Sequence, residues 1–142
     1  MAKKIFVNLP VKNLDKTKEF FSKLGFKFNP QFTDENAACM IIGENIYSML
    51  ITEKFFKSFI PGREISDAKK DTEVLNAILL NSKNEVDELV EKAVNAGGKT
   101  YRETFDYGWM YGKAFTDLDD HIWEIFYMNE KEMPKEMKDK GK

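Results

Sequence analysis

One pattern of helix and strands repeats in the sequence at an offset of 72 residues, and this repeat constrains the fold more than any other feature. Side chains three or four residues apart lie on one face of a helix, and glycine readily takes the left-handed conformation found at helix ends. The residues that recur are an apolar stripe and the glycine that follows it: Leu14 and Val86, Thr17 and Leu89, Phe21 and Ala93, Gly25 and Gly97. The sequence therefore predicts two helices of similar length and phase.

Each predicted helix stands between one strand and a run of three strands. The strand-like segments alternate apolar and polar residues and are separated by polar turns such as 34–36 and 43–45. These segments are residues 4–9, 26–33, 37–42 and 46–52 in the first half, and 74–81, 99–104, 109–116 and 122–128 in the second. The pattern predicts an α+β fold in which two tandem βαβββ modules form a cupped mixed sheet with helices on its outer face.

The predicted modules lie in a single domain that spans residues 1–128. The first module covers about residues 3–53 and the second about 73–128, because the residues between them, 54–72, break the alternation and are typical of a linker. The segment 129–142 is mostly charged, and we expect it to be a mobile tail.

Charge and cysteine content exclude several classes of partner. The 22 basic and 24 acidic residues are mixed along the chain, so no basic stripe points to nucleic acid. No apolar run is long enough to cross a membrane, and no signal peptide is evident. The one cysteine, Cys39, lies in an apolar run and cannot form an internal disulfide, so we expect a buried small side chain and a cytoplasmic protein.

Two segments carry a resemblance to a known superfamily. The segment 9–26, LPVKNLDKTKEFFSKLGF, and the segment 117–126, DLDDHIWEIF, resemble the first strand–helix junction and the closing hairpin of the vicinal oxygen chelate superfamily. That superfamily contains glyoxalase I, bleomycin-resistance proteins and type I extradiol dioxygenases. The resemblance covers residues 4–128 and is strongest to the bacterial group labelled predicted lactoylglutathione lyases. It implies a cup that binds a small molecule, and a homodimer.

The resemblance also implies where metal ligands would stand, and these places are poor in donors. They fall at Phe6, Leu50, Asn76 and Glu124. A catalytic divalent metal usually needs three or more imidazole, carboxylate or thiolate ligands. We therefore expect no cofactor and disfavour a divalent metal. Extradiol dioxygenase activity is unlikely because it needs two histidines and the chain has one.

The resemblance and the alternation along strands together predict a mixed cavity lining with Glu124 in it. The expected ligand-binding residues are Phe6, Asn8, Ser48, Leu50, Asn76, Trp109, Tyr111 and Phe126. The stretch 105–112 suits an aromatic flap over the cavity, or equally a loop that packs on the core. Phe55, Phe56 and Phe59 would close the same mouth or cover a dimer interface.

Glu124 is the candidate catalytic residue. A lone carboxylate in an apolar cup should have a raised pKa unless donors such as Asn76 hold it ionised. It could then serve as a general base, bind a polar group of a ligand, or only accept hydrogen bonds from its neighbours. His121, in the turn before the last strand, is interpreted as solvated or as a hydrogen-bond brace, with a proton shuttle as the alternative.

The leading hypothesis is a superfamily member that binds a small, partly apolar molecule in the cup without a complete classical metal site. The alternative is a lyase or isomerase of the lactoylglutathione lyase type, with Glu124 as general base or sole retained metal ligand. A sequestering resistance-type protein, or a cup filled by side chains, also fits the sequence. Whether the protein is an enzyme therefore stays open at this point.

Overall fold

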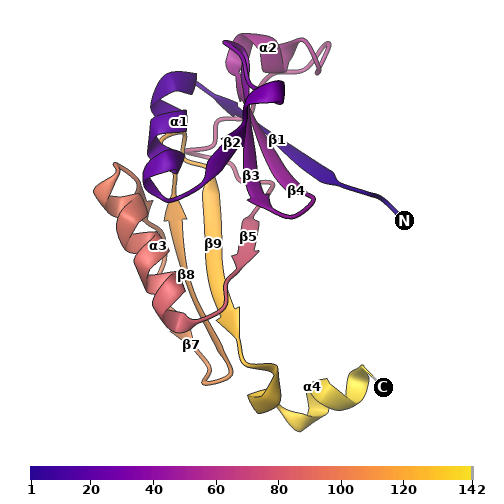
Figure 1. Ribbon diagram of the computed structural model, residues 1–142, viewed down its shortest axis with the longest axis vertical. Helices are drawn as coiled ribbons and strands as arrows, with labels where there is room; N and C mark the ends of the chain where they lie inside the picture. The colour runs from indigo at the N-terminus through magenta and orange to yellow at the C-terminus, as the bar shows by residue number, and fades with distance from the viewer. Residues whose placement is uncertain (142) are drawn as a thin grey trace. The chain divides into compact units, whose positions relative to one another are not determined.

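Two units with the same order of elements make up the chain, Met1–Asp71 and Thr72–Lys142 (Figure 1). The computed structural model describes residues 1–141. Each unit holds one mixed sheet, one helix of 10 or 13 residues and one shorter helix, which confirms the predicted α+β class and the two βαβββ modules. Within residues 1–141, no helix is both long and apolar enough to cross a membrane.

The first unit forms a four-stranded sheet in the order β1-β4-β3-β2. Strands β1 and β4 run parallel, and the other pairs are antiparallel. Its elements are β1 (Ile5–Val11), α1 (Leu14–Lys23), β2 (Lys27–Asn29), the 3-10 turn η1 (Pro30–Phe32), β3 (Ala37–Gly43), β4 (Ile46–Thr52) and α2 (Glu53–Lys57). The predicted strand 26–33 is therefore shorter than expected, because Pro30 begins a 3-10 turn.

The second unit repeats this topology in the order β5-β9-β8-β6, with β7 also paired to β8. Strands β5 and β9 are parallel, as β1 and β4 are in the first unit. The elements are β5 (Asn76–Leu79), α3 (Lys83–Asn95), β6 (Lys99–Thr100), β7 (Phe105–Asp106), β8 (Met110–Thr116), β9 (Ile122–Met128), the 3-10 turn η2 (Glu130–Glu132) and α4 (Lys135–Lys140). The segment predicted as a mobile tail contains η2 and α4, and its last residue, Lys142, lies outside the described residues.

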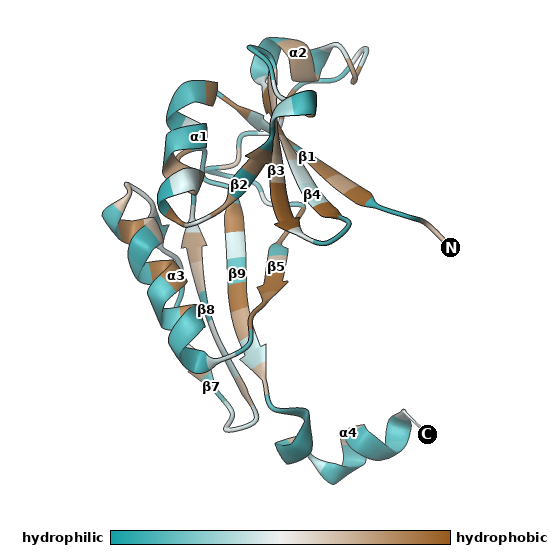
Figure 2. Ribbon diagram, in the orientation of Figure 1, coloured by the Kyte–Doolittle hydropathy of each residue, from teal (hydrophilic) through white to brown (hydrophobic). Residues whose placement is uncertain are grey.

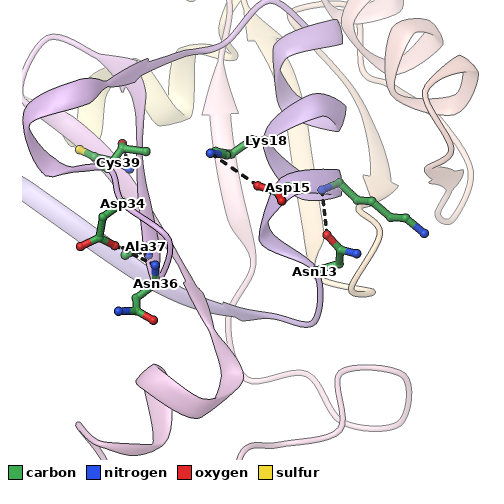
Figure 3. Close-up of polar contacts among 9 residues, drawn as sticks. Asn13, Asp15, Lys18, Asp34, Asn36, Ala37 and Cys39 are labelled. Carbon is green, nitrogen blue, oxygen red and sulfur yellow. Dashed lines mark hydrogen bonds and ion pairs between the residues drawn. The ribbon is translucent and has the colours of Figure 1, made fainter.

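The repeated helices begin and end as the sequence predicts. Asn13 Oδ1 accepts a hydrogen bond from the Lys16 backbone N–H at 3.0 Å and caps α1 (Figure 3). Ser82 Oγ caps α3 in the same way, and the Glu85 carboxylate accepts from the Asn81 backbone N–H at 2.7 Å. Gly25 and Gly97 follow the two helices with φ of 101° and 114°, a conformation in which a side chain would be strained.

The turn between β2 and β3 is held by a side chain. The Asp34 carboxylate accepts hydrogen bonds from the backbone N–H groups of Asn36 and Ala37, which fixes the polar turn expected at 34–36 (Figure 3). Cys39 follows on β3 and is fully buried, and burial raises the pKa of its thiol. The prediction of a buried small side chain is confirmed.

In each unit the helix covers one face of the sheet. Figure 2 shows apolar residues concentrated on the strands and polar residues on the outer sides of the helices. Helix α1 contributes Phe20 and Phe21 to the first core, and α3 packs on β8 and β9 in the second. Burying such side chains contributes about 1.5–3 kcal/mol each. The opposite face of each sheet is the one without a long helix over it, and we call it the uncovered face.

Candidate functional site

Ser48 and Leu50 belong to the first core and do not lie on the uncovered face. The register of the parallel pair sets Val7 beside Ser48 and Leu9 beside Leu50, so these side chains point toward α1. Both Ser48 and Leu50 are fully buried, and Ser48 Oγ donates a hydrogen bond to the Val7 carbonyl at 3.0 Å. Their assignment to a ligand site is wrong, because it assumed a register one residue away.

The uncovered face of the first sheet carries Phe6 and Asn8 as predicted for β1. Their register partners on β4 are Tyr47 and Met49, and the rings of Phe6 and Tyr47 stack with centroids 4.8 Å apart. A cavity of about 370 Å³ lies on this face. Its lining combines one amide with apolar side chains: Asn8, Ile51, Phe56, Phe59 and Ile60.

Asn76 and Tyr111 lie on the face of the second sheet that α3 covers. Asn76 pairs with Trp123 and Tyr111 with Tyr127, one position out of step with Glu124. The Tyr111 hydroxyl donates to the Asp87 carboxylate of α3 at 2.5 Å. The predictions that Asn76 and Tyr111 share a cavity with Glu124 are therefore wrong, again because of the strand register.

Asp87 is the centre of a polar cluster between α3 and β8. Lys113 Nζ lies 2.9 Å from its carboxylate, beside the bond from Tyr111. The hydrogen bond from Tyr111, with Lys113 adding to it, holds the pKa of Asp87 below its ordinary value. The same bond raises the pKa of Tyr111. This cluster ties the helix to the sheet and is separate from the uncovered face.

The uncovered face of the second sheet is mostly apolar along β5, β8 and β9, where Thr116 and Glu124 are its polar residues, and Lys99 of β6 lies beside Thr116 on the same face. The register places ten side-chain positions of β5, β8 and β9 on it: Ala77, Leu79, Met110, Gly112, Ala114, Thr116, Ile122, Glu124, Phe126 and Met128. Glu124 is the one charged residue among these ten positions. Phe126 shares this face, as expected. Trp109 comes directly before Met110, and Met110 pairs with Met128 on β9. Met128 is four residues from Glu124, which is about 13 Å along the strand.

Glu124 is paired with an arginine. Arg102 Nη2 donates to Glu124 Oε1 at 2.6 Å, the length of a charge-assisted hydrogen bond. The two side chains remain 33% and 27% exposed, so the pair is open to a solute on one side. The expectation of a lone carboxylate in an apolar cup is therefore wrong.

Arg102 reaches Glu124 because the chain breaks its strand there. The predicted strand 99–104 is interrupted between β6 and β7, and Arg102 has φ of 51°, an uncommon conformation for a residue with a side chain. Its guanidinium lies over the Phe105 ring, 5.3 Å from the centroid. This contact is a cation–π interaction that holds the cation above the sheet.

Gly112 provides the space that Phe105 occupies. A Cβ added at Gly112 would overlap the Phe105 ring, so the ring lies directly on the strand at this point. Phe105 also stacks on Tyr107, with centroids 5.4 Å apart. The stretch that was expected to be either a flap or a core-packing loop is thus the β7–β8 hairpin, and Gly112, Phe105 and Arg102 form one layered support for the ion pair.

Sequence reasoning missed Arg102 and the role of Phe105. Arg102 is one of two arginines in the chain, and the other is Arg63. The signal available in the sequence was a cation on the predicted strand 99–104 and a carboxylate, Glu124, on the predicted strand 122–128. The break at Arg102 hid it, because no glycine or proline marks this irregular backbone.

Asp117 braces the turn that precedes β9. Its buried carboxylate accepts hydrogen bonds from the Trp123 indole N–H at 2.9 Å and from the backbone N–H groups of Asp119 and His121. Burial raises the pKa of Asp117, and the neighbouring His121 acts in the opposite direction. His121 therefore lies in a structural turn that its backbone N–H helps to hold, and the role of its imidazole stays a prediction.

The side chains near Glu124 do not suit a divalent metal. Its register partners on the same face are Ala77 and Ala114, which offer no donor, and its own carboxylate holds Arg102. In the first unit, the β4 positions on the uncovered face are Tyr47, Met49 and Ile51 rather than Leu50. Throughout residues 1–141, no group of three or more His, Cys, Asp or Glu side chains is placed to bind a metal ion.

Comparisons with known proteins agree with the two-module fold. The family model described as bleomycin resistance protein-like N-terminal matches residues 3–43. A hypothetical protein from S. aureus is 32% identical, with 89% of this chain and 95% of that chain covered and a TM-score of 0.74. No curated protein matches the sequence significantly.

Two more distant structures share the fold. A glyoxalase/bleomycin resistance protein/dioxygenase family enzyme from Burkholderia phytofirmans has 15% identity and a TM-score of 0.75 over 89% of this chain and 99% of that one. A fosfomycin resistance protein from Listeria monocytogenes has 19% identity and a TM-score of 0.64 over 89% of this chain and 91% of that one. These likenesses extend over both units of the chain.

Proposed function

The chain belongs to the glyoxalase/bleomycin resistance/dioxygenase superfamily, and from this premise we propose that it binds a small, partly apolar molecule without a complete classical metal site. The observation that carries the proposal is the Arg102–Glu124 pair, a partly exposed ion pair on a mostly apolar sheet face. Small-molecule sites typically combine apolar walls with a few polar groups that orient the ligand. The uncovered face of the second sheet has this composition.

The walls around the pair are aromatic and aliphatic. Phe105 lies under the guanidinium, and Phe126 and Leu79 share the face with Glu124. Leu79 is 52% exposed, so part of this apolar surface is available to a ligand. Burial of apolar area gains about 25 cal/mol per Å², and the ion pair adds orientation rather than most of the affinity.

The cavity of the first unit supports a partly apolar ligand as well. Its volume of about 370 Å³ is within the range of small-molecule sites, roughly 300–1,000 Å³. Asn8 is its one polar side chain among apolar neighbours such as Phe56 and Ile60. Phe59 is 62% exposed at this site, so its ring can move without loss of much packing.

A lyase or isomerase of the lactoylglutathione lyase type is the second candidate, and no contact in residues 1–141 favours it over binding. A metal at Glu124 would have to displace the Arg102 guanidinium from Oε1. The fosfomycin resistance in the name of one structurally similar protein describes that protein and is not evidence for the same activity in this chain. Binding is therefore the conclusion we draw.

We also propose a homodimer in the cytoplasm. Val74, Leu75 and Leu79 in and beside the edge strand β5 are each 52% exposed, and an unpaired apolar strand edge is a common place for association. Light scattering after size-exclusion chromatography should give about twice the mass of one chain, and a monomer at micromolar concentration would contradict this part.

The function is tested by a fragment screen with ligand-observed NMR on protein dialysed against chelator, followed by amide shift mapping. We expect hits that perturb residues 110–114 and 122–126. The variant Ala77→Tyr, which places a ring beside Glu124, should lose them, while the control Val94→Tyr on the exposed side of α3 should keep them. Hits that map neither to this face nor to the first-unit cavity beside Asn8, or that need added metal, would overturn the proposal.

A further inference from the structure

We propose that the Arg102–Glu124 pair recognises a small amino carboxylate with an apolar side chain, a ligand that presents an anion and a cation close together. This inference rests on the proposed binding function and names its ligand class. It follows from the hydrogen-bonding groups that the pair leaves free, from the rigid support under it and from its charge balance.

The pair is joined by a single hydrogen bond, which leaves groups of both kinds free. A guanidinium has five N–H donors, and Arg102 uses one for Glu124 Oε1 and a second for a long contact of 3.4 Å to the Glu103 carbonyl. Within residues 1–141, Glu124 Oε2 has no hydrogen-bond partner. The pair therefore offers unused donors and an unused anionic acceptor on adjacent side chains, and both side chains are partly exposed.

The guanidinium is held in place before any ligand arrives. The Phe105 ring lies below it, Gly112 gives that ring its place on β8, and Tyr107 stacks on the ring. The uncommon φ of 51° at Arg102 directs the side chain over this support. A cation positioned in advance loses little conformational entropy on binding, which favours recognition by a small molecule.

The balance of charge selects the ligand class. A ligand with only a negative charge would accept hydrogen bonds from Arg102 but be repelled by the Glu124 carboxylate. A ligand with only a positive charge would be attracted to Glu124 but repelled by the Arg102 guanidinium. A ligand that carries both charges matches both, with its carboxylate on the guanidinium fork and its ammonium on Oε2. The complex then keeps the net charge of the partly buried pair at zero, which avoids the cost of an unpaired charge.

The apolar surface around the pair determines the rest of the ligand. Phe126, Leu79 and the edge of Phe105 lie on the same face, and they offer no hydrogen-bonding group to a polar side chain. An aromatic or branched aliphatic side chain fits this surface, so L-phenylalanine is a suitable probe.

The test compares three probes that share a phenylethyl body: L-phenylalanine, 3-phenylpropanoate and 2-phenylethylamine. Affinities are measured by amide shift titration of the full chain. L-Phenylalanine should bind about tenfold more tightly than either single-charge probe. Arg102→Met should reduce the affinity for L-phenylalanine to that for 2-phenylethylamine. Glu124→Gln should reduce it to the affinity for 3-phenylpropanoate. Arg102→Lys should recover part of the loss because it keeps the charge without the fork.

The control is Arg63→Met, which removes the other arginine at an exposed position and should change nothing. If 3-phenylpropanoate binds as tightly as L-phenylalanine to the unmodified chain, the ligand class is wrong and the binding function stands. The same holds if none of the three probes binds while fragments map to this face. If fragments map only to the first-unit cavity, the ligand class is wrong and the binding function stands. If neither the probes nor any fragment maps to this face or to that cavity, both proposals fall.

Discussion

The two sheets share one topology and differ on their uncovered faces. In both units a parallel strand pair stands at one edge, a capped helix covers one face, and a glycine with positive φ follows the helix. On the other face, the first sheet presents Asn8 and Ile51 under the aromatic side chains that follow β4, without a charged side chain in the cavity lining. The second presents Glu124 with Arg102.

This difference separates what maintains the fold from what the chain offers a ligand. The helix-covered faces of both units are built mainly from buried apolar side chains, such as Phe21 and Trp123, because both must bury a core of similar size. The uncovered faces carry no such common requirement, so they can differ without loss of the fold. The chemistry of this chain therefore lies on the faces that differ.

The largest expected effect compares the last turn of each module. Asp117→Ala removes the acceptor for the Trp123 indole and for two backbone N–H groups, and should lower the free energy of unfolding by about 3 kcal/mol. Glu44→Ala replaces an exposed residue in the corresponding turn of the first unit, and should change the free energy of unfolding by less than about 0.5 kcal/mol. Urea denaturation measures the free energy of unfolding of both variants. Equal losses in the two variants would contradict the expected difference between the two turns.

The next effect compares two glycines. Gly112→Ala forces the Phe105 ring from its place and should cost about 1–3 kcal/mol, with loss of the Arg102 contact. At Gly43 the nearest atom to an added Cβ is Ile46 Cδ1 at 3.6 Å, an ordinary contact, so Gly43→Ala should be close to neutral. Thermal unfolding and the Arg102 side-chain NMR signal report the two consequences, and an unmoved Arg102 signal in Gly112→Ala would contradict the layered support.

A smaller effect concerns the contact between each helix and its sheet. The pKa of Asp87 is lower in the folded protein than its ordinary value of 3.8, mainly because of the hydrogen bond from Tyr111. The ionised carboxylate therefore stabilises the folded state fully above pH 3.8. This contribution is lost as the pH falls through the folded pKa. Asp87→Asn should therefore cost up to about 1 kcal/mol at pH 7, discounted for its 45% exposure, and nothing once the pH is well below the folded pKa of Asp87.

The control is Asp15→Asn on α1, where the carboxylate lies 3.8 Å from Lys18 and is almost fully exposed. Its effect should stay below about 0.5 kcal/mol at pH 7. A stability difference for Asp87→Asn that persists undiminished in acid would show that the carboxylate charge is not the cause.

The sequence predicts elements better than it predicts neighbours. The 72-residue repeat located both helices, because helix phase and glycine ends are local properties of the chain. Ser48, Leu50 and Asn76 were placed on the wrong face, because alternation orders residues within a strand and says nothing about register between parallel strands. Tyr111 was expected in a possible flap, and the antiparallel register of β8 with β9 places it on the helix-covered face.

The Arg102–Glu124 pair illustrates a second reason. Its members lie 22 residues apart, and Arg102 lies in the irregular segment between β6 and β7, with φ of 51° and no glycine to mark it. Glu124 was identified from the sequence, because the resemblance of segment 117–126 to the superfamily's closing hairpin implies a site residue at that position. Its partner was not, because a conformation that is rare for arginine leaves no local signal.

The central claim is that the cation facing Glu124 is the guanidinium of Arg102. The most direct test is a titration of 15N-labelled protein with Mn²⁺, whose unpaired electrons broaden the amide signals of residues near a bound ion. We expect no selective broadening of residues 122–126 at one equivalent of Mn²⁺, because Glu124 Oε1 is engaged and no second metal ligand faces it among its strand partners. Selective broadening of residues 122–126 that saturates at one equivalent would contradict the claim.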